Sequence, residues 1–349
     1  MSKMTEQGGT LLLPDGTPGT GNGTGDVLRR GLGVFGRQRE ATILVVTVAL
    51  LLYFGLTNPT TFVSRTNFVD LFSENMAPIA IIAVGEVFLL ICGEIDLSVG
   101  FIYTCSPFVM FFLNQYFGIP ILLAIILSLV FGLVCGWVNG FLTVTLHLPS
   151  FITTLGTGFI LGGAALYLAH AEPKSIPPAT VGYGDWIGAS PWSQTIWAVV
   201  IVAIFAVVLT RTRWGLHTIA TGGNQLGARE AGINVGRIKY GNFMITGVLG
   251  ALVGIQTAFY INTIDPLAGG YQPMFYSVTA AVIGGTAMLG GSGTIIGAGI
   301  GAVALSTLID GFDVVGISAN VVQIVFGAAI LVAMIANVQL TRLRERGRT

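Results

Sequence analysis

About ten runs of predominantly apolar residues, each near the length needed to cross a bilayer, constrain this chain more than any other feature. A hydrocarbon core of about 30 Å needs about 20 apolar residues in a helix, with a range of about 17 to 25. The runs predict an all-α fold, a polytopic membrane helix bundle of about ten transmembrane helices. The predicted spans are 41–57, 68–92, 97–114, 119–145, 150–170, 193–211, 240–262, 274–290, 294–310 and 317–338.

The composition agrees with a membrane protein and argues against several other classes. Of 349 residues, 53% are hydrophobic and only 9% are charged, which is far from the usual soluble composition. The net charge is zero and no basic cluster has interleaved aromatic residues, so no nucleic-acid partner is expected. The 3 cysteines lack C-x-x-C spacing, and the 3 histidines lack a paired nucleophile or an H-E-x-x-H motif. We therefore expect no metal site, no disulfide framework and no enzymatic activity.

The distribution of charge predicts three regions and an orientation in the membrane. Residues 1–40 are polar and rich in Gly, Thr and Pro before a group of arginines, which predicts a disordered cytoplasmic tail and not a signal peptide. Residues 41–338 form the predicted transmembrane domain, and residues 339–349 form a basic cytoplasmic tail. All 16 Lys and Arg residues except Arg65 and Lys174 fall on the side of both termini. The positive-inside rule therefore places both termini in the cytoplasm.

The order of the spans predicts two inverted five-helix halves. Spans two to five (68–170) and spans seven to ten (240–338) form blocks of four, and the offset of five spans gives the blocks opposite orientations. Their sequences do not align convincingly, so this prediction rests on topology. The eighth and ninth runs are short and are separated by the turn 290–293, which leaves room for partly re-entrant helices.

The segment Gly93–Gly100, which reads G-E-I-D-L-S-V-G, places two carboxylates between apolar runs. A charge at membrane depth costs several kcal/mol unless it is capped, paired or hydrated, so the segment is either a structural turn or part of a pathway. As a turn, Asp96 is the expected N-cap of the third span, and Asp96→Asn should then be tolerated. We call this segment the signature turn, with Glu94, Asp96, Ser98 and Gly100 as its candidate functional residues.

Polar residues inside the spans mark a candidate path across the membrane. Asn75 and Glu86 are eleven residues apart and therefore only about 20° apart around an ideal helix, with a kink expected at Pro78 between them. Glu86 is either a buried acid held by a neighbouring span or a residue that lines a wet cavity. Other single polar residues are more often helix–helix contacts than ligand contacts. The candidate path residues are Asn75, Glu86, Asn139 and Gln256.

The cytoplasmic loop 211–239 contains a predicted short helix that lies across the membrane face. The helix has a Gly-rich entry, Asn224 as its expected N-cap and Gly232 as its expected C-terminal stop. The candidate residues of this helix are Gly223, Asn224, Ala228, Arg229, Glu230, Ala231 and Gly232.

Repeated glycines predict close helix packing. Gly132, Gly136 and Gly140 recur every four residues, a spacing that lets helix backbones approach closely in a membrane. The Gly-rich runs after residue 282 are not followed by Gly-Lys-Ser/Thr, which argues against a nucleotide-binding loop.

Several separated motifs together resemble one transporter family. They are the signature turn, the G-W-V-N-G of 136–140 with the L-P-S-F-I-T-T-L-G of 148–156, the G-G-N…A-R-E-A-G-I of 222–233, and the V-I-G-G-T…G-G-S-G-T of 282–294. Over residues 65–337 the chain resembles permease subunits of bacterial ATP-binding-cassette importers for ribose, xylose and related sugars. Glu94 stands where many ribose-type members have a small residue, which is nearer to xylose-type members.

The resemblance implies a multi-pass protein of the bacterial cytoplasmic (inner) membrane that translocates a monosaccharide or related polyol. It implies a second permease subunit, a cytoplasmic ATPase that uses the ATP, an extracytoplasmic sugar-binding protein and no cofactor of the chain's own. The segment 223–232 would be the helix that couples the permease to the ATPase. The alternatives are an ion-coupled secondary transporter, in which Glu86, Glu94 or Asp96 binds the ion, and a related permease for nucleosides or branched-chain amino acids.

Overall fold

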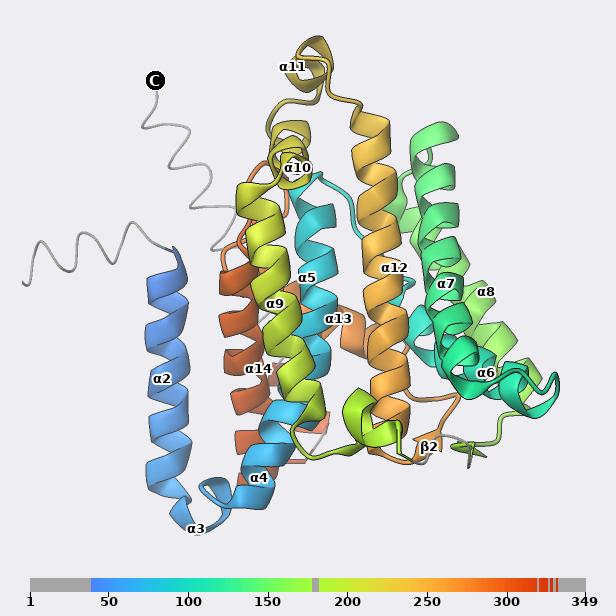
Figure 1. The fold of residues 1–349 in the computed structure, drawn as a ribbon. Helices are drawn as coiled ribbons and strands as arrows, with labels where there is room; N and C mark the ends of the chain where they lie inside the picture. Colours follow the sequence, from blue (N-terminus) through green and yellow to red (C-terminus); the bar gives the residue numbers. More distant parts are fainter. Residues whose placement is uncertain (1–38, 178–181, 319, 326, 329–330, 332–349) are drawn as a thin grey trace, which may run out of the picture. The chain divides into compact units, whose positions relative to one another are not determined.

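The computed structural model describes residues 39–177, 182–318, 320–325, 327–328 and 331. The predicted tails therefore lie outside the described residues, apart from residues 39 and 40. The unit that begins at Arg39 is helical except for one short pair of strands (Figure 1). Its elements are α2 (Arg39–Thr57), α3 (Pro59–Phe62), α4 (Arg65–Val69), η1 (Asp70–Met76), α5 (Ala77–Ile91), α6 (Val99–Gln115), α7 (Ile121–Gly140), η2 (Phe141–Thr145), α8 (Ser150–Ala169), β1 (Lys174–Ser175), η4 (Asp185–Ala189), α9 (Ser193–Arg211), α10 (Arg213–Gly223), α11 (Gln225–Glu230), α12 (Val235–Tyr260), β2 (Thr263–Ile264), α13 (Tyr271–Ile283) and α14 (Ile295–Val315).

The described residues contain 7 helices that are long and apolar enough to cross a membrane, which confirms the predicted polytopic helical fold. They include the continuous helices Arg65–Ile91 and Ile121–Thr145. The predicted third span forms α6, an apolar helix of 17 residues. The predicted eighth span forms α13, which has only 13 residues and at 1.5 Å per residue is about 20 Å long. Half of the residues of the predicted tenth span, 317–338, lie outside the described residues.

The second span contains a wide turn before Pro78, where the sequence predicted a kink. Residues Asp70–Met76 form the π-helix η1, and the α-helical geometry resumes at Ala77. Pro78 has no backbone N–H and so donates no hydrogen bond to the preceding turn. Widening this turn therefore breaks one hydrogen bond fewer than widening a turn before any other residue. The π-helix also changes the rotation per residue, so Asn75 and Glu86 do not follow the ideal spacing assumed from the sequence.

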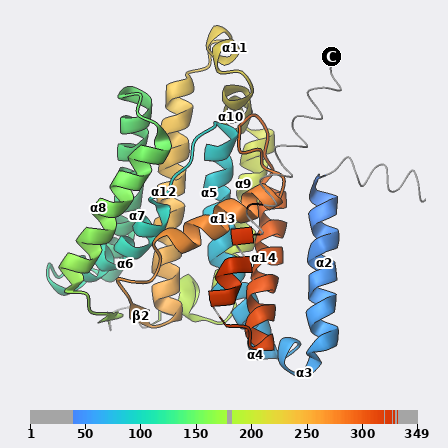
Figure 2. The same ribbon diagram turned by 180° about the vertical axis from the view of Figure 1, so that it is seen from behind.

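The helices pack as two inverted sets. Helix α6 packs on α7 and α12, whereas α13 packs on α14 and α5. Helix α7 packs on α12, and α14 packs on α5 and η1. Exchanging α5 with α12, α6 with α13 and α7 with α14 turns one set of partners into the other. This packing matches the inverted halves predicted from the order of the spans (Figures 1 and 2).

Helices α6 and α13 meet at their N-terminal ends. The backbone N–H of Gly270 donates to the carbonyl of Gly100 at 3.1 Å. A Cβ atom on Gly100 would lie 1.8 Å from the carbonyl oxygen of Gly270, so only glycine fits at this crossing. Each short helix is preceded by a non-helical segment, residues 92–98 before α6 and residues 265–270 before α13.

The interior is built around α5 and α12. Every residue of α5 except Pro78 is buried. Gly132 and Gly136 of α7 face α12, where a Cβ atom on Gly132 would lie 2.4 Å from the carbonyl oxygen of Gly247. These contacts confirm the predicted role of the repeated glycines, because any side chain there would separate the two backbones.

Candidate functional site

The signature turn is held by a buried carboxylate whose hydrogen bonds are satisfied locally. Asp96 is 0% exposed, and its Oδ1 accepts the Ser98 N–H at 2.8 Å and the Ser98 hydroxyl at 2.6 Å. The amide of Asn139, from the cytoplasmic end of α7, donates to Asp96 Oδ2 at 3.1 Å. Asn139 Oδ1 in turn accepts from Thr157 of α8 at 2.8 Å. The turn therefore joins α6, α7 and α8 through hydrogen bonds.

The predicted N-cap role of Asp96 needs a correction. Helix α6 begins at Val99 with Ser98 in the N-cap position, and Ser98 makes no side-chain cap bond. Asp96 lies two residues earlier, where its carboxylate closes a tight turn on the Ser98 amide. The late start could not be predicted, because the apolar Leu97 directly after Asp96 resembles the first residue of the following apolar run.

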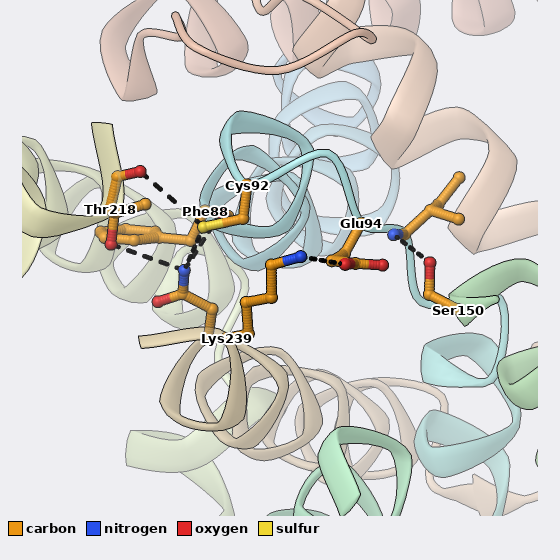
Figure 3. A network of polar contacts seen from close by, with 8 residues as sticks. Phe88, Cys92, Glu94, Ser150, Thr218 and Lys239 are labelled. Atoms are coloured by element: carbon orange, nitrogen blue, oxygen red, sulfur yellow. Dashed lines mark hydrogen bonds and ion pairs between the residues drawn. The ribbon is translucent and has the colours of Figure 1, made fainter. Parts of the chain in front are cut away.

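Glu94 forms an ion pair that connects the signature turn to α12. Lys239 Nζ lies 2.5 Å from Glu94 Oε1, and the two side chains are only 14% and 12% exposed (Figure 3). Lys239 stands 145 residues away in the sequence. From the sequence, Lys239 is expected only as one of the cytoplasmic charges, and no local pattern pairs it with Glu94. Its place just before an apolar run was the one signal that it stands at the membrane boundary.

Asn242, one turn of α12 after Lys239, links three helices next to this ion pair. Its amide nitrogen donates to the Phe88 carbonyl at 3.2 Å and to Cys92 Sγ at 3.3 Å, both near the end of α5 (Figure 3). Its oxygen accepts from Trp214 of α10 at 2.9 Å. A buried, satisfied network of this kind fixes the relative positions of its helices. Asn242 therefore attaches α10 to both α5 and α12.

Helix α11 confirms the predicted short helix and its two ends. Asn224 Oδ1 accepts the Gly227 N–H at 2.9 Å as an N-cap. Gly232 follows the helix with a φ of +79°, the left-handed conformation that glycine adopts most easily. Within the predicted segment, Ala228 is buried. The remaining predicted residues are exposed: Gly223, Asn224, Arg229, Glu230, Ala231 and Gly232.

One exposed residue of α11 was missed in the sequence. Leu226 is 67% exposed although it is a large apolar residue. The only sequence signal was its place one residue after the N-terminal residue of the short helix.

The end of α10, just before α11, contacts the end of α5. A Cβ atom on Gly222 would lie 1.6 Å from the carbonyl oxygen of Ile91. The same carbonyl accepts the Gly291 N–H at 2.8 Å. The base of α11, the end of α5 and the loop between α13 and α14 therefore meet at one point.

The four candidate path residues do not share one surface of this chain. Glu86 and Asn139 are 0% exposed and Gln256 is 1% exposed, whereas Asn75 is partly exposed. Among the described residues, neither Glu86 oxygen has a hydrogen-bond partner of good geometry, although the Asp96 backbone N–H lies close enough to interact with the carboxyl group. The structure thus places Glu86 inside the chain and gives Asn139 a partner in the signature turn. A role in transport for these residues stays a prediction.

Comparisons with known proteins agree with this arrangement. The model of the family described as "Branched-chain amino acid transport system / permease component" matches residues 69–334. The xylose/arabinose import permease protein of Sulfolobus acidocaldarius is 34% identical over 86% of this chain and 85% of its own. The ribose import permease protein of Bacillus subtilis is 34% identical over 84% of this chain and 89% of its own. The D-allose transport system permease protein of Escherichia coli is 30% identical over 84% and 88%. No solved structure matches the chain significantly.

Proposed function

This chain belongs to the permease component family of the branched-chain amino acid transport system type, and on that premise we propose that it is the membrane subunit of an ATP-driven sugar importer. The proposed cargo is a monosaccharide or related polyol, carried into the cytoplasm of a bacterium across its inner membrane. The strongest support is that relatives at 30–34% identity, matched over most of both chains, are named as sugar import permeases.

The proposed partners are a second permease subunit, a cytoplasmic ATPase that uses the ATP, and an extracytoplasmic sugar-binding protein. Helix α11 offers the ATPase an exposed apolar side chain, Leu226, on the cytoplasmic side. An apolar residue in the centre of a small contact surface is typical of a protein–protein hot spot. No cofactor of the chain's own is proposed.

The contacts suggest how movement of α11 would reach the membrane interior. Helix α10 precedes α11 and is attached through Asn242 to α5 and α12. The Glu94–Lys239 ion pair then connects α12 to the signature turn, and the signature turn leads into α6. A displacement of α11 by the ATPase would therefore move the short helix α6 relative to its neighbours, as alternating access requires.

The ion-coupled alternative is less well supported. Glu94 is paired with Lys239, and Asp96 is occupied by donors from Ser98 and Asn139. Of the three carboxylates considered for an ion, only Glu86 has oxygens without a hydrogen-bond partner. The relatives are named as import permeases for sugars, which does not favour the nucleoside or amino acid alternative.

Reconstitution tests the proposal directly. The permease is placed in proteoliposomes with the ATPase and binding protein encoded beside it, and uptake of radiolabelled D-xylose, L-arabinose and D-ribose is measured. We expect uptake that requires ATP on the cytoplasmic side and that persists when ionophores collapse proton and sodium gradients. Uptake that is lost with the ion gradient while ATP is held constant would overturn the proposal in favour of a secondary transporter.

A further inference from the structure

Helix α13 begins in the middle of the membrane-spanning bundle and not at its surface. Its first residue follows Gly270, which is bonded to Gly100 at the start of α6. The neighbouring Val99 packs against Gly250 of α12, ten residues before α12 ends at Tyr260. Ten residues of helix span about 15 Å, half the hydrocarbon thickness. Figures 1 and 2 both show α13 between the two ends of α5.

The exposed side of α13 carries polar groups at this depth. Gln272 is exposed, and its amide donates to the Tyr276 hydroxyl at 2.8 Å. The segment 265–270 before it is non-helical backbone. Non-helical backbone and amides at membrane depth are found where they are covered by protein or line a water-filled cavity, not where they face lipid. The exposed side of α13 therefore does not face lipid.

Aromatic rings gather around Tyr271, the residue before Gln272. Tyr271 packs edge-on against Phe101 with ring centroids 4.8 Å apart. Phe159 of α8 lies 6.0 Å and Phe275 lies 6.3 Å from the Tyr271 ring centroid. Phe159 is 63% exposed and Phe275 is 48% exposed, so both rings next to Tyr271 are accessible from outside the described chain.

We propose that Phe159, Tyr271, Gln272 and Phe275 form the wall over which the sugar crosses the middle of the membrane. We call these four residues the α13 wall. A monosaccharide has apolar C–H faces and polar hydroxyl edges, and exposed rings beside an amide match both kinds of surface. The inference rests on the proposed function and adds to it the residues that contact the substrate. It also differs from the path predicted from sequence, whose members are mostly buried.

Water accessibility tests the wall without any need for transport. Gln272 and Phe275 are replaced singly by cysteine in the full complex in proteoliposomes, and the rate of modification by the charged reagent MTSET is measured. Ile204→Cys is the control, because Ile204 is 54% exposed near the middle of α9, a helix without polar breaks. Only a hydrated thiol ionises and reacts, so we expect the two wall cysteines to react at least about tenfold faster than the control. The unsubstituted protein supplies the background of the three native cysteines.

Two results of this labelling would overturn the inference. The first is a reaction at Gln272→Cys and Phe275→Cys that is no faster than at Ile204→Cys. The second is a disulfide between two copies at Phe275→Cys together with slow labelling, because that result would show that the partner permease covers the wall.

Transport assays test the contact with sugar. We expect Phe159→Ala and Gln272→Ala to lower the uptake of the transported sugar at least about tenfold, the loss of a good contact, while the amount of folded protein in the membrane stays unchanged. Ile204→Ala should transport normally. Normal uptake by both wall variants overturns the inference alone and leaves the proposed function standing. If the unsubstituted complex takes up no sugar, the proposed function and the sugar assignment are both overturned. Rapid labelling at Gln272→Cys in that complex would still show that the α13 wall is lined by water.

Discussion

At the scale of single residues, the structure explains how two carboxylates are tolerated close to the membrane interior. Asp96 receives donors from Ser98 and Asn139, and Glu94 is paired with Lys239. Two residues apart in the sequence, they have different kinds of partner. Asp96 accepts hydrogen bonds from uncharged groups within the first half. Glu94 forms a charge pair with a residue of the other half.

The cluster around Asp96 changes the expected effect of Asp96→Asn. The new amide nitrogen would replace Oδ2 and face the amide nitrogen of Asn139. Asn139 would keep Oδ1 and the Ser98 hydroxyl as acceptors, but the new amide nitrogen would face a donor in place of an acceptor. We expect the variant to lose about 1–3 kcal/mol of stability, the usual cost of an unsatisfied buried group, measured as thermal unfolding of the purified permease in detergent. The double variant Asp96→Asn/Asn139→Asp restores one donor and one acceptor and should recover most of the loss. An unfolding temperature for Asp96→Asn equal to that of the unsubstituted protein would contradict this account.

The Glu94–Lys239 pair predicts a different pattern. Glu94→Gln leaves a largely buried ammonium group without its partner, which should cost about 2–4 kcal/mol. The neutral pair Glu94→Gln/Lys239→Met removes the unpaired charge and should be more stable than Glu94→Gln alone. Unfolding in detergent measures both stabilities. If the double variant is no more stable than Glu94→Gln, the ion pair is not what holds the turn against α12.

At the scale of elements, α11 combines a buried attachment with an exposed contact surface. Ala228 is 5% exposed, whereas Leu226 is 67% exposed. The N-cap at Asn224 and the glycine stop at Gly232 define the ends of the short helix. Such a helix cannot be stable by its own propensity at this length, so it depends on these ends and on the attachment of Ala228.

Leu226→Asp is predicted to weaken docking of the ATPase without changing the stability of the permease. The change removes an exposed apolar side chain and should weaken binding of the ATPase at least about tenfold, roughly 1.4 kcal/mol. Sugar-stimulated ATP hydrolysis should fall accordingly, while the unfolding temperature of the permease stays the same. Ala228→Leu is the matched comparison, because it overfills a buried position and should destabilise the permease itself. Unchanged ATPase affinity in Leu226→Asp would show that α11 is not the docking helix.

At the scale of the whole described unit, the two inverted sets of helices meet where α6 and α13 begin. The Gly100–Gly270 contact joins helices from the two halves at the middle of the membrane. Its close backbone approach explains why Gly100 has no room for a side chain, whereas Gly270 has a φ of +73°, a conformation that side chains rarely adopt.

Gly100→Ala should therefore disrupt the junction of the halves. The new methyl group would lie 1.8 Å from the Gly270 carbonyl oxygen, and backbone on both sides leaves nothing flexible to move aside. We expect a loss of about 1–3 kcal/mol or more and a loss of uptake, measured by unfolding and by proteoliposome transport. Gly156→Ala is the control, because a Cβ atom there meets nothing within 4 Å. Equal stability of the two variants would mean that the halves are not tightly joined at Gly100.

Properties that depend on single residues or on near neighbours in the chain could be predicted from the sequence. Apolar length and the bias of Lys and Arg predicted a polytopic helical membrane protein, because each residue contributes to membrane partitioning independently of its distant neighbours. The caps at Asn224 and Gly232 were predictable for the same reason, since a cap involves only nearby backbone. The glycine spacing in α7 correctly marked a close helix contact.

Only the tertiary structure decided which runs cross the membrane in one helix and which residues meet. The run 97–114 forms the 17-residue helix α6, whereas the run 274–290 gives only the 13-residue helix α13. The non-helical segment 265–270 before α13 packs against α6, where Thr104 donates to the Ala268 carbonyl and Gly270 donates to the Gly100 carbonyl. The pairing of Glu94 with Lys239, 145 residues apart, and of Gly100 with Gly270 depends on the folded arrangement of both halves. No local pattern encodes such contacts, since their energy is gained only after distant helices have packed.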